Sequence, residues 1–340
     1  MTFLDEVKTA VTPRAALLVI GVLALQLLFI ASYVGALHNP KPKDVPFAVV
    51  APEQSAGQLV DQLGALPGTP LDPRTVADEA TARRQIMNRQ IDGALIVDPA
   101  SKTDTLLVAS GGGTVLSSAL TTLATRVEAA QQREVRTVDV APASAQDFDG
   151  LSAFYLVVGW CVGGYLCASI LAISAGSRPA NGQRAVIRLG AMALYAIAGG
   201  IGGAVIVGPL LGALPGSVMA LWGLGALVVF AVGAITLALQ ALTGIVGIGL
   251  AVLLVVIAGN PSAGGAFPLP MLPPFWEAIG PALPPGAGTW VARSIAYFEG
   301  NAVLGPFIVL AGWAVAGSAI TLAMASLRRP PDSDSHPVGA

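Results

Sequence analysis

Apolar runs dominate this chain, and one polar block interrupts them. A transmembrane helix takes about 20 consecutive apolar residues, and six runs approach or exceed that length. They cover residues 15–37, 151–174, 189–212, 217–240, 243–259 and 303–327. The charged residues between 151 and 327 are only Arg178, Arg184, Arg188, Glu277, Arg293 and Glu299. Because a Lys, Arg or Asp at the centre of a spanning helix costs about 2.5–3.5 kcal/mol, the pattern predicts an α-helical polytopic membrane protein with six transmembrane helices.

The first apolar run admits two interpretations. Val34-Gly35-Ala36 has the small-x-small form that a signal peptidase accepts. However, the uncharged run over 15–37 is longer than the roughly 7–15 residues of a signal-peptide core, and Asp5 and Glu6 interrupt a basic leader. We therefore expect a retained membrane anchor rather than a cleaved signal.

The polar block, residues 38–150, has the pattern of a small mixed domain. We expect strands at 46–51, 92–97, 104–109 and 134–140. We expect helices that begin near residue 52, cover 77–89, and run from the glycines at 111–113 to about residue 133. This alternation of strands and helices over about 110 residues predicts one layered α/β domain with its own core.

Basic residues near the span ends predict the orientation, because short loops rich in Lys and Arg stay on the cytoplasmic side. These residues are Lys8, Arg14, Arg178, Arg184, Arg188, Arg328 and Arg329. With six spans, all of them lie on one side. We expect a multi-pass protein of the bacterial plasma (inner) membrane, with both termini cytoplasmic and an extracytoplasmic α/β domain between helices 1 and 2. The expected parts are 1–37, 38–150, a five-helix domain at 151–327, and a disordered cytoplasmic tail at 328–340.

The segment 260–301 is apolar, but it contains too many prolines for one continuous helix. Non-helical backbone at membrane depth survives only where protein buries it or where it lines a cavity, and the aromatic residues of this segment suit the lipid–water boundary. We expect two short interfacial or re-entrant helices on the outer face, near 273–280 and 286–298. Two roles remain open from the sequence, a hairpin that caps the bundle and a gate or exit for a translocated molecule.

Several segments resemble one family of membrane proteins. They are the Asn-Pro-Ser-Ala-Gly-Gly stretch at 260–265, Leu283-Pro284 ahead of Arg293, Val45-Pro46-Phe47-Ala48-Val49-Val50, and Arg83-Arg84-Gln85-Ile86 running into the strand at 92–97. With the layout of one span, an outer α/β domain and five further spans, the chain resembles the YhgE/Pip-like branch of type-2 ABC (ATP-binding cassette) permeases. Ala51-Pro52-Glu53 departs from the family, where an Asn and an acidic residue usually follow the first strand.

The resemblance implies an export-type permease body that works as a homodimer or pseudo-dimer, with the outer hairpin dipping into the membrane. The candidate gate or exit residues are Asn260, Pro261, Ser262, Gly264, Gly265, Glu277, Pro284 and Arg293. Any ATPase would be a separate cytoplasmic subunit. The candidate docking surfaces for that subunit are residues 1–14 and the loop with Arg178, Arg184 and Arg188, although those arginines also serve as the orientation signal.

Residues for catalysis and for phosphate binding are sparse. The only lysines are Lys8, Lys41, Lys43 and Lys102, and none follows a phosphate-binding loop. Cys161 and Cys167 lie on different faces of one expected helix, and His38 and His336 lie near a membrane boundary and in the tail. We expect no enzyme activity, no metal and no cofactor.

Composition and charge argue against some functions that a membrane protein could have. Only 11% of the residues are charged, against about 25% in soluble domains, and the net charge of -2 gives no reason to expect nucleic acid. The expected spans contain no Asp, Glu, Lys or His, and their only amide side chains are Gln26 and Gln240, which disfavours proton-coupled transport. We expect a permease component that exports a hydrophobic or amphipathic substrate. The alternative is an envelope scaffold, accessory or receptor protein that binds a partner through its outer domain.

Overall fold

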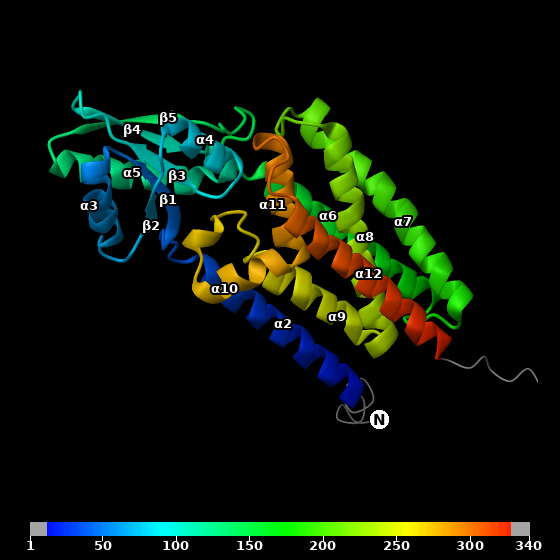
Figure 1. Ribbon diagram of the computed structural model, residues 1–340. Coiled ribbons are helices and arrows are strands. Elements are labelled where there is room, and N and C mark those ends of the chain that lie inside the picture. The colour runs from blue at the N-terminus through cyan, green and yellow to red at the C-terminus, as the bar shows by residue number, and fades with distance from the viewer. Residues whose placement is uncertain (1–11, 328–340) are drawn as a thin grey trace, which may run out of the picture.

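The computed structural model describes residues 12–327. Most of these residues are helical, and one small mixed β-sheet lies at one end of a bundle of long helices (Figure 1). The described chain ends, at the start of α2 (Pro13–Leu37) and the end of α12 (Leu304–Ser326), both lie at the end of the bundle away from the sheet. Lys8, Arg328, Arg329, His336 and the tail at 328–340 lie outside the described residues.

The sheet has five strands in the order β2-β1-β3-β4-β5. The strands are β1 (Val45–Val50), β2 (Leu71–Thr75), β3 (Gly93–Ile96), β4 (Thr103–Val108) and β5 (Glu134–Asp139). β1 is parallel to both β2 and β3, β3 is antiparallel to β4, and β4 is parallel to β5. The four strands expected from the sequence are confirmed, and β2 is an additional strand that the pattern did not indicate.

β2 escaped prediction because its sequence, Leu-Asp-Pro-Arg-Thr, has little of the character of a strand. Pro73 cannot donate a ladder hydrogen bond, so proline is confined to edge strands and strand ends. β2 lies at the edge of the sheet, and only Leu71 among its residues is buried. Position in the sheet, rather than local propensity, makes this segment a strand.

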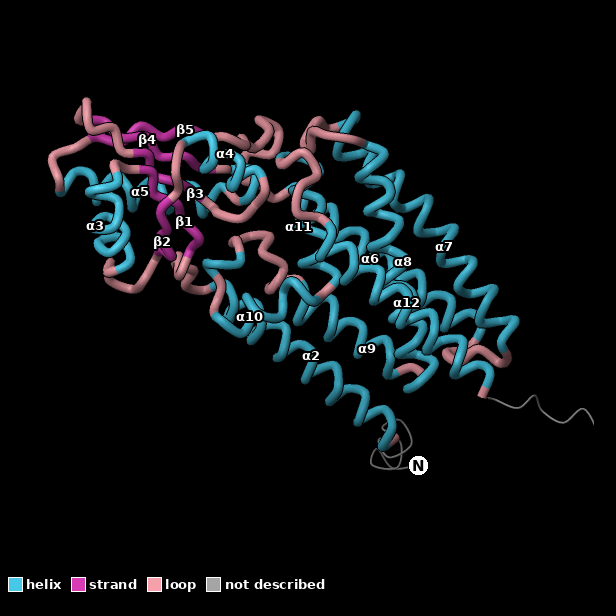
Figure 2. The backbone as a smooth tube through the Cα atoms, viewed as in Figure 1, coloured by secondary structure: helices cyan, strands magenta, loops and turns pink. Residues whose placement is uncertain are grey.

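The two faces of the sheet have different coverings. Phe47, Val49 and Leu106 face a core formed with α3 (Glu53–Gly64) and α5 (Thr114–Ala130). Ala48 and Leu107 belong to a second cluster, which includes Ile86 of α4 (Glu79–Met87) and extends into the helical bundle. Figure 2 shows the strands between α3 and α5 on one side and α4 on the other. One face of the sheet is therefore continuous with the core of the bundle.

Within residues 12–327, five helices are long and apolar enough to cross a membrane. Besides α2 and α12 they are α6 (Ser152–Ala175), α7 (Gly182–Val205, continued by the π-helix η2, Ile206–Leu210) and α8 (Val218–Thr243). α8 is the most buried of the five and packs against α6, α7 and α12. Pro215 and Gly216 lie between η2 and α8, and Gly216 has a positive φ of 104°.

The fifth expected span, 243–259, is a shorter helix. α9 (Val246–Val252) gives way to the π-helix η3 (Leu253–Gly259), and together they are below the length of the five long helices. Asn260-Pro261 follows directly, and the proline-rich segment after it cannot extend the helix. The structure therefore shows five candidate spans, and six complete spans are not confirmed.

α7 begins at Gly182, earlier than the expected start at 189. The Asn181 side chain caps the helix by accepting a hydrogen bond from the Arg184 N–H at 2.9 Å. Arg184 and Arg188 consequently lie within the first turns of the long apolar helix, and the expectation that they belong to a loop is wrong. The five long helices contain no Asp, Glu, Lys or His, as expected, and the two arginines enter only because α7 begins earlier than 189.

The segment 260–301 folds into the outer hairpin, which lies between the sheet and the bundle. It contains η4 (Leu269–Met271), α10 (Pro274–Ile279), η5 (Gly280–Ala282) and α11 (Pro284–Tyr297). Prolines occupy the first turns of α10 and α11, where a missing N–H costs nothing. Helices thus form close to the two expected places, and their depth relative to a membrane stays a prediction.

Candidate functional site

Arg293 holds the outer hairpin together. It extends from α11, is 4% exposed, and donates hydrogen bonds to the carbonyl oxygens of Gly264 (2.6 Å), Gly265 (2.7 Å) and Gly150 (3.1 Å). Gly264 has a φ of 68°, a conformation that residues with a side chain rarely adopt. This turn presents two carbonyl groups to one guanidinium, so a buried cation links the 260–265 segment, α11 and the start of α6.

The sheet domain contacts the hairpin through further hydrogen bonds. The Lys43 N–H donates to the Pro270 carbonyl at 2.9 Å, and the Asn301 side chain donates to the Met87 carbonyl at 3.2 Å. The Tyr297 hydroxyl donates to the Asp147 carboxylate at 2.8 Å. Because these bonds come from both ends of the hairpin, they fix the sheet domain above it.

A cavity of about 600 Å³ lies where these parts meet. The sheet domain lines it with Asp44, Arg89 and Asp92, and the outer hairpin lines it with residues between Ala263 and Arg293. The start of α12 completes the wall with Leu304, Gly305 and Pro306. Leu304 is 74% exposed, so the cavity reaches the outer surface of the bundle at α12. Proline, glycine, leucine and alanine dominate the lining, as in pockets that bind small molecules.

Hydrogen bonds and two aromatic rings fix the side chain of Arg89 in this cavity. Its guanidinium lies 3.4 Å from the centroid of the Trp290 ring and 4.8 Å from that of Phe298. Its Nη1 donates to the Trp290 carbonyl at 2.8 Å and to Ser294 Oγ at 2.9 Å. The indole N–H of Trp290 in turn donates to the Ala302 carbonyl at 2.9 Å. Trp290 therefore holds Arg89 from one side and the start of α12 from the other.

Backbone strain concentrates around the same cavity. Arg89 follows the C-cap of α4 with a φ of 56°, at a place where glycine is the usual residue. Asp44 (φ 47°) and Ala302 (φ 56°) line the cavity as well, so three of the six described non-glycine residues with positive φ lie in its wall. Such strain costs about 1–3 kcal/mol per residue and gathers at functional sites.

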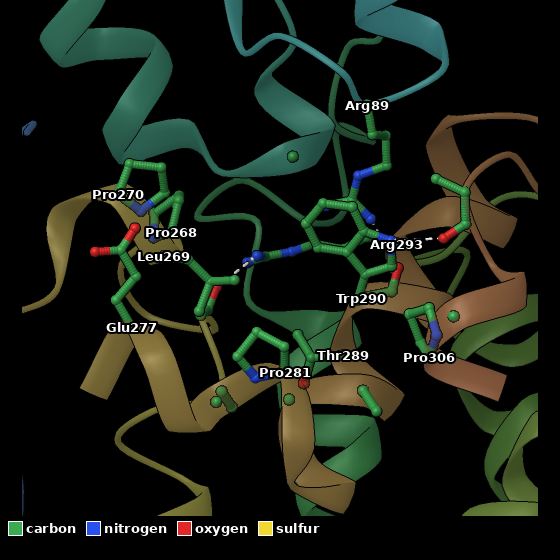
Figure 3. A pocket seen from close by; sticks show the side chains of 18 of the residues that line it. Arg89, Pro268, Leu269, Pro270, Glu277, Pro281, Thr289, Trp290, Arg293 and Pro306 are labelled. Atoms are coloured by element: carbon green, nitrogen blue, oxygen red, sulfur yellow. Dashed lines mark hydrogen bonds between the residues drawn. The ribbon is translucent and has the colours of Figure 1, made fainter. Parts of the chain in front are cut away.

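The charged groups of the cavity are arranged by depth. Arg293 is buried and Arg89 half-buried, whereas Asp44 and Glu277 are exposed. Figure 3 shows Arg89, Trp290 and Arg293 together, with Glu277 beside Pro268 and Pro270 on the other side of the view. Arg89 and Arg293 make the inner end of the cavity basic, and Asp44 and Glu277 lie at its exposed rim. Asp92, which is half-buried, also lines the cavity and lies close enough to Arg89 for their charges to interact.

Burial affects the two charged groups of the sheet domain that face this space. Burial and, next, the charge of Arg293 lower the pKa of Arg89 to about 9, so Arg89 remains cationic at neutral pH. Burial raises the pKa of Asp92 to about 6, although the charge of Arg89 opposes the shift. For Glu277, burial and the neighbouring Asp44 raise the pKa.

The structure separates the candidate gate residues into two groups. Gly264, Glu277 and Arg293 line the cavity. The others support the hairpin from outside that lining, and they are Asn260, Pro261, Ser262, Gly265 and Pro284. Asn260 donates to the Tyr33 hydroxyl of α2 at 3.2 Å, and Ser262 donates to the Ala258 carbonyl at 2.7 Å. Arg293 pairs with no carboxylate within the described residues, and carbonyl oxygens bind it instead.

The candidate docking arginines have different surroundings at the other end of the bundle. Arg178 and Arg184 are exposed, and Arg178 donates to the Leu242 carbonyl at 3.3 Å. Arg188 is 6% exposed and donates to the carbonyls of Ala175 and Gly176, both at 2.7 Å. Arg188 thus caps the end of α6, which leaves Arg178 and Arg184 as the accessible members of the set.

Sequence reasoning missed Arg89, Asp92 and Trp290 as cavity residues. Arg89 appeared only as the end of a charged helix, and Trp290 only as one of several interfacial aromatic residues. They are 201 residues apart along the chain, and no local pattern joins them. One feature of the sequence could have drawn attention to Arg89. It occupies the position after the end of a helix, where glycine is usual.

The described residues contain no group of three or more His, Cys, Asp or Glu side chains that would hold a metal ion. Cys161 is buried and Cys167 half-buried, and the two are not joined. The lining of the cavity combines apolar surface with the side chains of Arg89 and Arg293.

Comparisons of the chain with family models, with curated proteins and with solved structures find no match. The resemblance to type-2 ABC permeases therefore rests on the residues and the layout described above.

Proposed function

We propose that this chain is the membrane-spanning permease of an export system that moves a hydrophobic or amphipathic molecule outward. One observation carries the proposal, the 600 Å³ cavity that the hairpin, the sheet domain and the start of α12 enclose. Its volume lies within the range of about 300–1,000 Å³ that is usual for small-molecule sites. Its place between apolar helices and a polar domain suits a molecule that leaves a membrane.

The proposal includes an orientation and partners. The sheet domain is extracytoplasmic, the termini and the α6–α7 connection are cytoplasmic, and the membrane is a bacterial plasma membrane. The resemblance to type-2 ABC permeases supports a homodimer or pseudo-dimer and a separate ATPase subunit. The α6–α7 connection and the start of α7 lie at the end of the bundle remote from the sheet. Arg178 and Arg184, which are exposed there, are the docking candidates for that subunit.

The test is transport by the chain together with its native ATPase. Crosslinking in native membranes followed by purification identifies the ATPase, and both proteins are then placed in vesicles that contain a fluorescent phospholipid. ATP-dependent appearance of the label in the leaflet facing the sheet domain, measured by quenching with an impermeant reductant, is the expected result. If no ATPase co-purifies and ATP moves no lipid, the scaffold or receptor alternative replaces the proposal.

A pair of variants connects transport to the cavity. Gly305 lines the cavity and Gly312 does not, although both lie in α12 and have no atom within 4 Å of an added Cβ. Gly305→Phe fills the space, so we expect ATP-dependent transport to fall at least about tenfold, as for the loss of about 1.4 kcal/mol. Gly312→Phe is the matched control and is expected to transport normally. Equal transport by the two variants would contradict a route through this cavity.

A further inference from the structure

The two arginines of the cavity have no ion-pair partner. The ion pairs within residues 12–327 join Arg83 to Glu79 and Arg133 to Asp104 and Glu128, all in the sheet domain. Arg293 instead donates to three carbonyl oxygens, which do not neutralise its charge. Because an uncompensated charge is costly away from water, the inner end of the cavity favours a negatively charged occupant.

Arg89 supplies the free donors that such an occupant needs. A guanidinium carries five N–H groups, and the two on Nη1 bind Trp290 and Ser294. The N–H groups on Nε and Nη2 have no partner among the described residues. Stacking on Trp290 and Phe298 fixes the guanidinium plane, which prepares these donors for a carboxylate or phosphate oxygen.

The acidic groups do not take up these donors. Asp92 is the closest in sequence, but its carboxylate lies beyond 4.0 Å of every Lys or Arg nitrogen in the described chain, since no ion pair includes it. Glu277 and Asp44 lie at the exposed rim, where the charge of Lys43 acts on Glu277. Between the rim and the basic end the lining is apolar, with Leu269, Pro281 and Ala287 among its residues.

From this arrangement we infer that the cavity binds an anionic amphiphile, with its negatively charged head group on Arg89 and its apolar part along Leu269, Pro281 and Ala287. The inference names the substrate class of the proposed exporter and in that sense rests on the proposed function. The chemistry recognised is a phosphate or carboxylate group attached to a hydrocarbon body. A membrane lipid and a free anion both offer such a group, and the experiment separates them.

The test measures lipid binding without transport. The full chain in a neutral detergent is titrated with phosphatidylglycerol, phosphatidylcholine or inorganic phosphate, and the first bound molecule is counted by native mass spectrometry. We expect phosphatidylglycerol to bind at least about tenfold more tightly than phosphatidylcholine, as one charge-assisted hydrogen bond provides. Phosphate alone is expected to bind at least about tenfold more weakly than phosphatidylglycerol, because it lacks the apolar part.

Four variants test whether the preference for phosphatidylglycerol depends on Arg89 and on the cavity. Arg89→Gln is expected to reduce the preference to less than about threefold, because a neutral amide loses the charge that strengthens the hydrogen bond. Arg89→Lys keeps the charge and is expected to retain an intermediate preference, which guards against a folding defect. Arg126→Gln removes an exposed arginine of α5 and is expected to change nothing. Gly305→Phe is expected to abolish tight binding by filling the cavity.

Equal binding of the two lipids by the wild type, or an unchanged preference in Arg89→Gln, overturns the inference. Phosphate that binds as tightly as phosphatidylglycerol also overturns it, since the site would then hold a free anion. The outcomes are separate from those of the transport test. Export without an anionic preference defeats only the inference, whereas an Arg89-dependent preference without ATP-driven transport defeats only the proposed function.

Discussion

Arg89 has a backbone conformation that is unfavourable for arginine, and this conformation accompanies a contact with Trp290, which is distant in the sequence. The left-handed backbone costs a residue with a side chain about 1–2 kcal/mol, and glycine at this position would avoid the cost. The observed side chain recovers it through two hydrogen bonds and a cation–π contact, which contribute about 1 kcal/mol each. The free energy gained from these long-range contacts therefore offsets the cost of the left-handed backbone at Arg89.

A second residue, Glu128 of α5, makes the sheet domain sensitive to pH. It is 2% exposed, one of its oxygens has no hydrogen-bond partner, and Arg133 binds the neighbouring Asp104 bidentately, at 2.7 and 2.6 Å. Burial, and then the adjacent Asp104, raise the pKa of Glu128 from 4.5 to about 7. The folded domain therefore holds this proton more tightly than the unfolded chain does, and the resulting stability is fully present only below pH 4.5.

We predict that this stability is lost as the pH rises from 4.5 through 7. Hydrogen exchange of α5 and β4 in the full chain, corrected for the intrinsic pH dependence of exchange, is expected to be at least about tenfold faster at pH 8 than at pH 5. Glu128→Gln removes the ionisation and should make exchange equally slow at both values. Glu134→Gln, at an exposed position of β5, is the control and should keep the wild-type pH dependence. A wild type with no pH dependence would contradict the role of Glu128.

At the scale of elements, the sequence predicted most of the architecture wherever hydrophobic periodicity was strong. The pattern indicated β1, β3, β4 and β5, the helices between them, and the long apolar helices. It missed β2, whose place depends on pairing with β1, and it overestimated the fifth span, where η3 ends at Asn260-Pro261. Periodicity reports which face of an element is buried, but it does not report which elements pair or how far a helix continues.

The cavity was predictable only in part, for a related reason. The proline- and glycine-rich hairpin attracted attention because it is apolar and cannot be one helix, and Gly264, Glu277 and Arg293 from that segment do line the cavity. The opposite wall comes from the sheet domain, through Arg89 and Asp92. Contacts between segments some 200 residues apart depend on tertiary packing, which the pattern of a single sequence does not contain.

The close approach of η5 and α11 gives a prediction about these elements. A Cβ at Gly286 would overlap the Gly280 carbonyl oxygen, a backbone atom that cannot rotate away. Gly286→Ala is therefore expected to lower the free energy of unfolding by about 1–3 kcal/mol, as overpacking does. Tryptophan fluorescence during heating in detergent measures the change, since Trp276 and Trp290 lie in the same hairpin.

The control for this variant is Gly190→Ala in α7, where an added Cβ meets no atom within 4 Å. Alanine is favoured over glycine inside a helix by roughly 0.5–1 kcal/mol, so the control is expected to be at least as stable as the wild type. Similar melting temperatures for the two variants would show that the hairpin tolerates separation of η5 from α11.

At the scale of the whole molecule, one apolar cluster joins the membrane helices to the sheet domain. It runs from Ala48 and Leu107 of the sheet through Tyr297 of α11 to Val228 of α8. A domain attached only by a flexible linker would share no hydrophobic core with the helices. Here the same packing that stabilises the sheet also positions Arg89 over the hairpin, so the cavity and the fold depend on each other.

The arrangement of the parts predicts the topology. The sheet domain and the α6–α7 connection lie at opposite ends of the helical bundle (Figure 1), and the long helices between them are apolar enough to span a membrane. In a background with Cys167→Ala, we expect an impermeant thiol reagent added to intact cells to label Gln131→Cys after α5. It should label Ala180→Cys between α6 and α7 only after the membrane is opened, because lipid separates these two exposed positions.

Because Cys161 is buried, we expect it to stay unlabelled in both variants, so that the signal comes from the introduced thiols alone. The reverse pattern, with Ala180→Cys labelled first, would place the sheet domain in the cytoplasm and remove the outward direction of export. The chain crosses the membrane once between residues 131 and 180 if α6 is a span. Labelling of both positions from outside would mean that it does not cross there. That result would be incompatible with α6 as a span, and with a cavity that lies between the membrane and an extracytoplasmic domain.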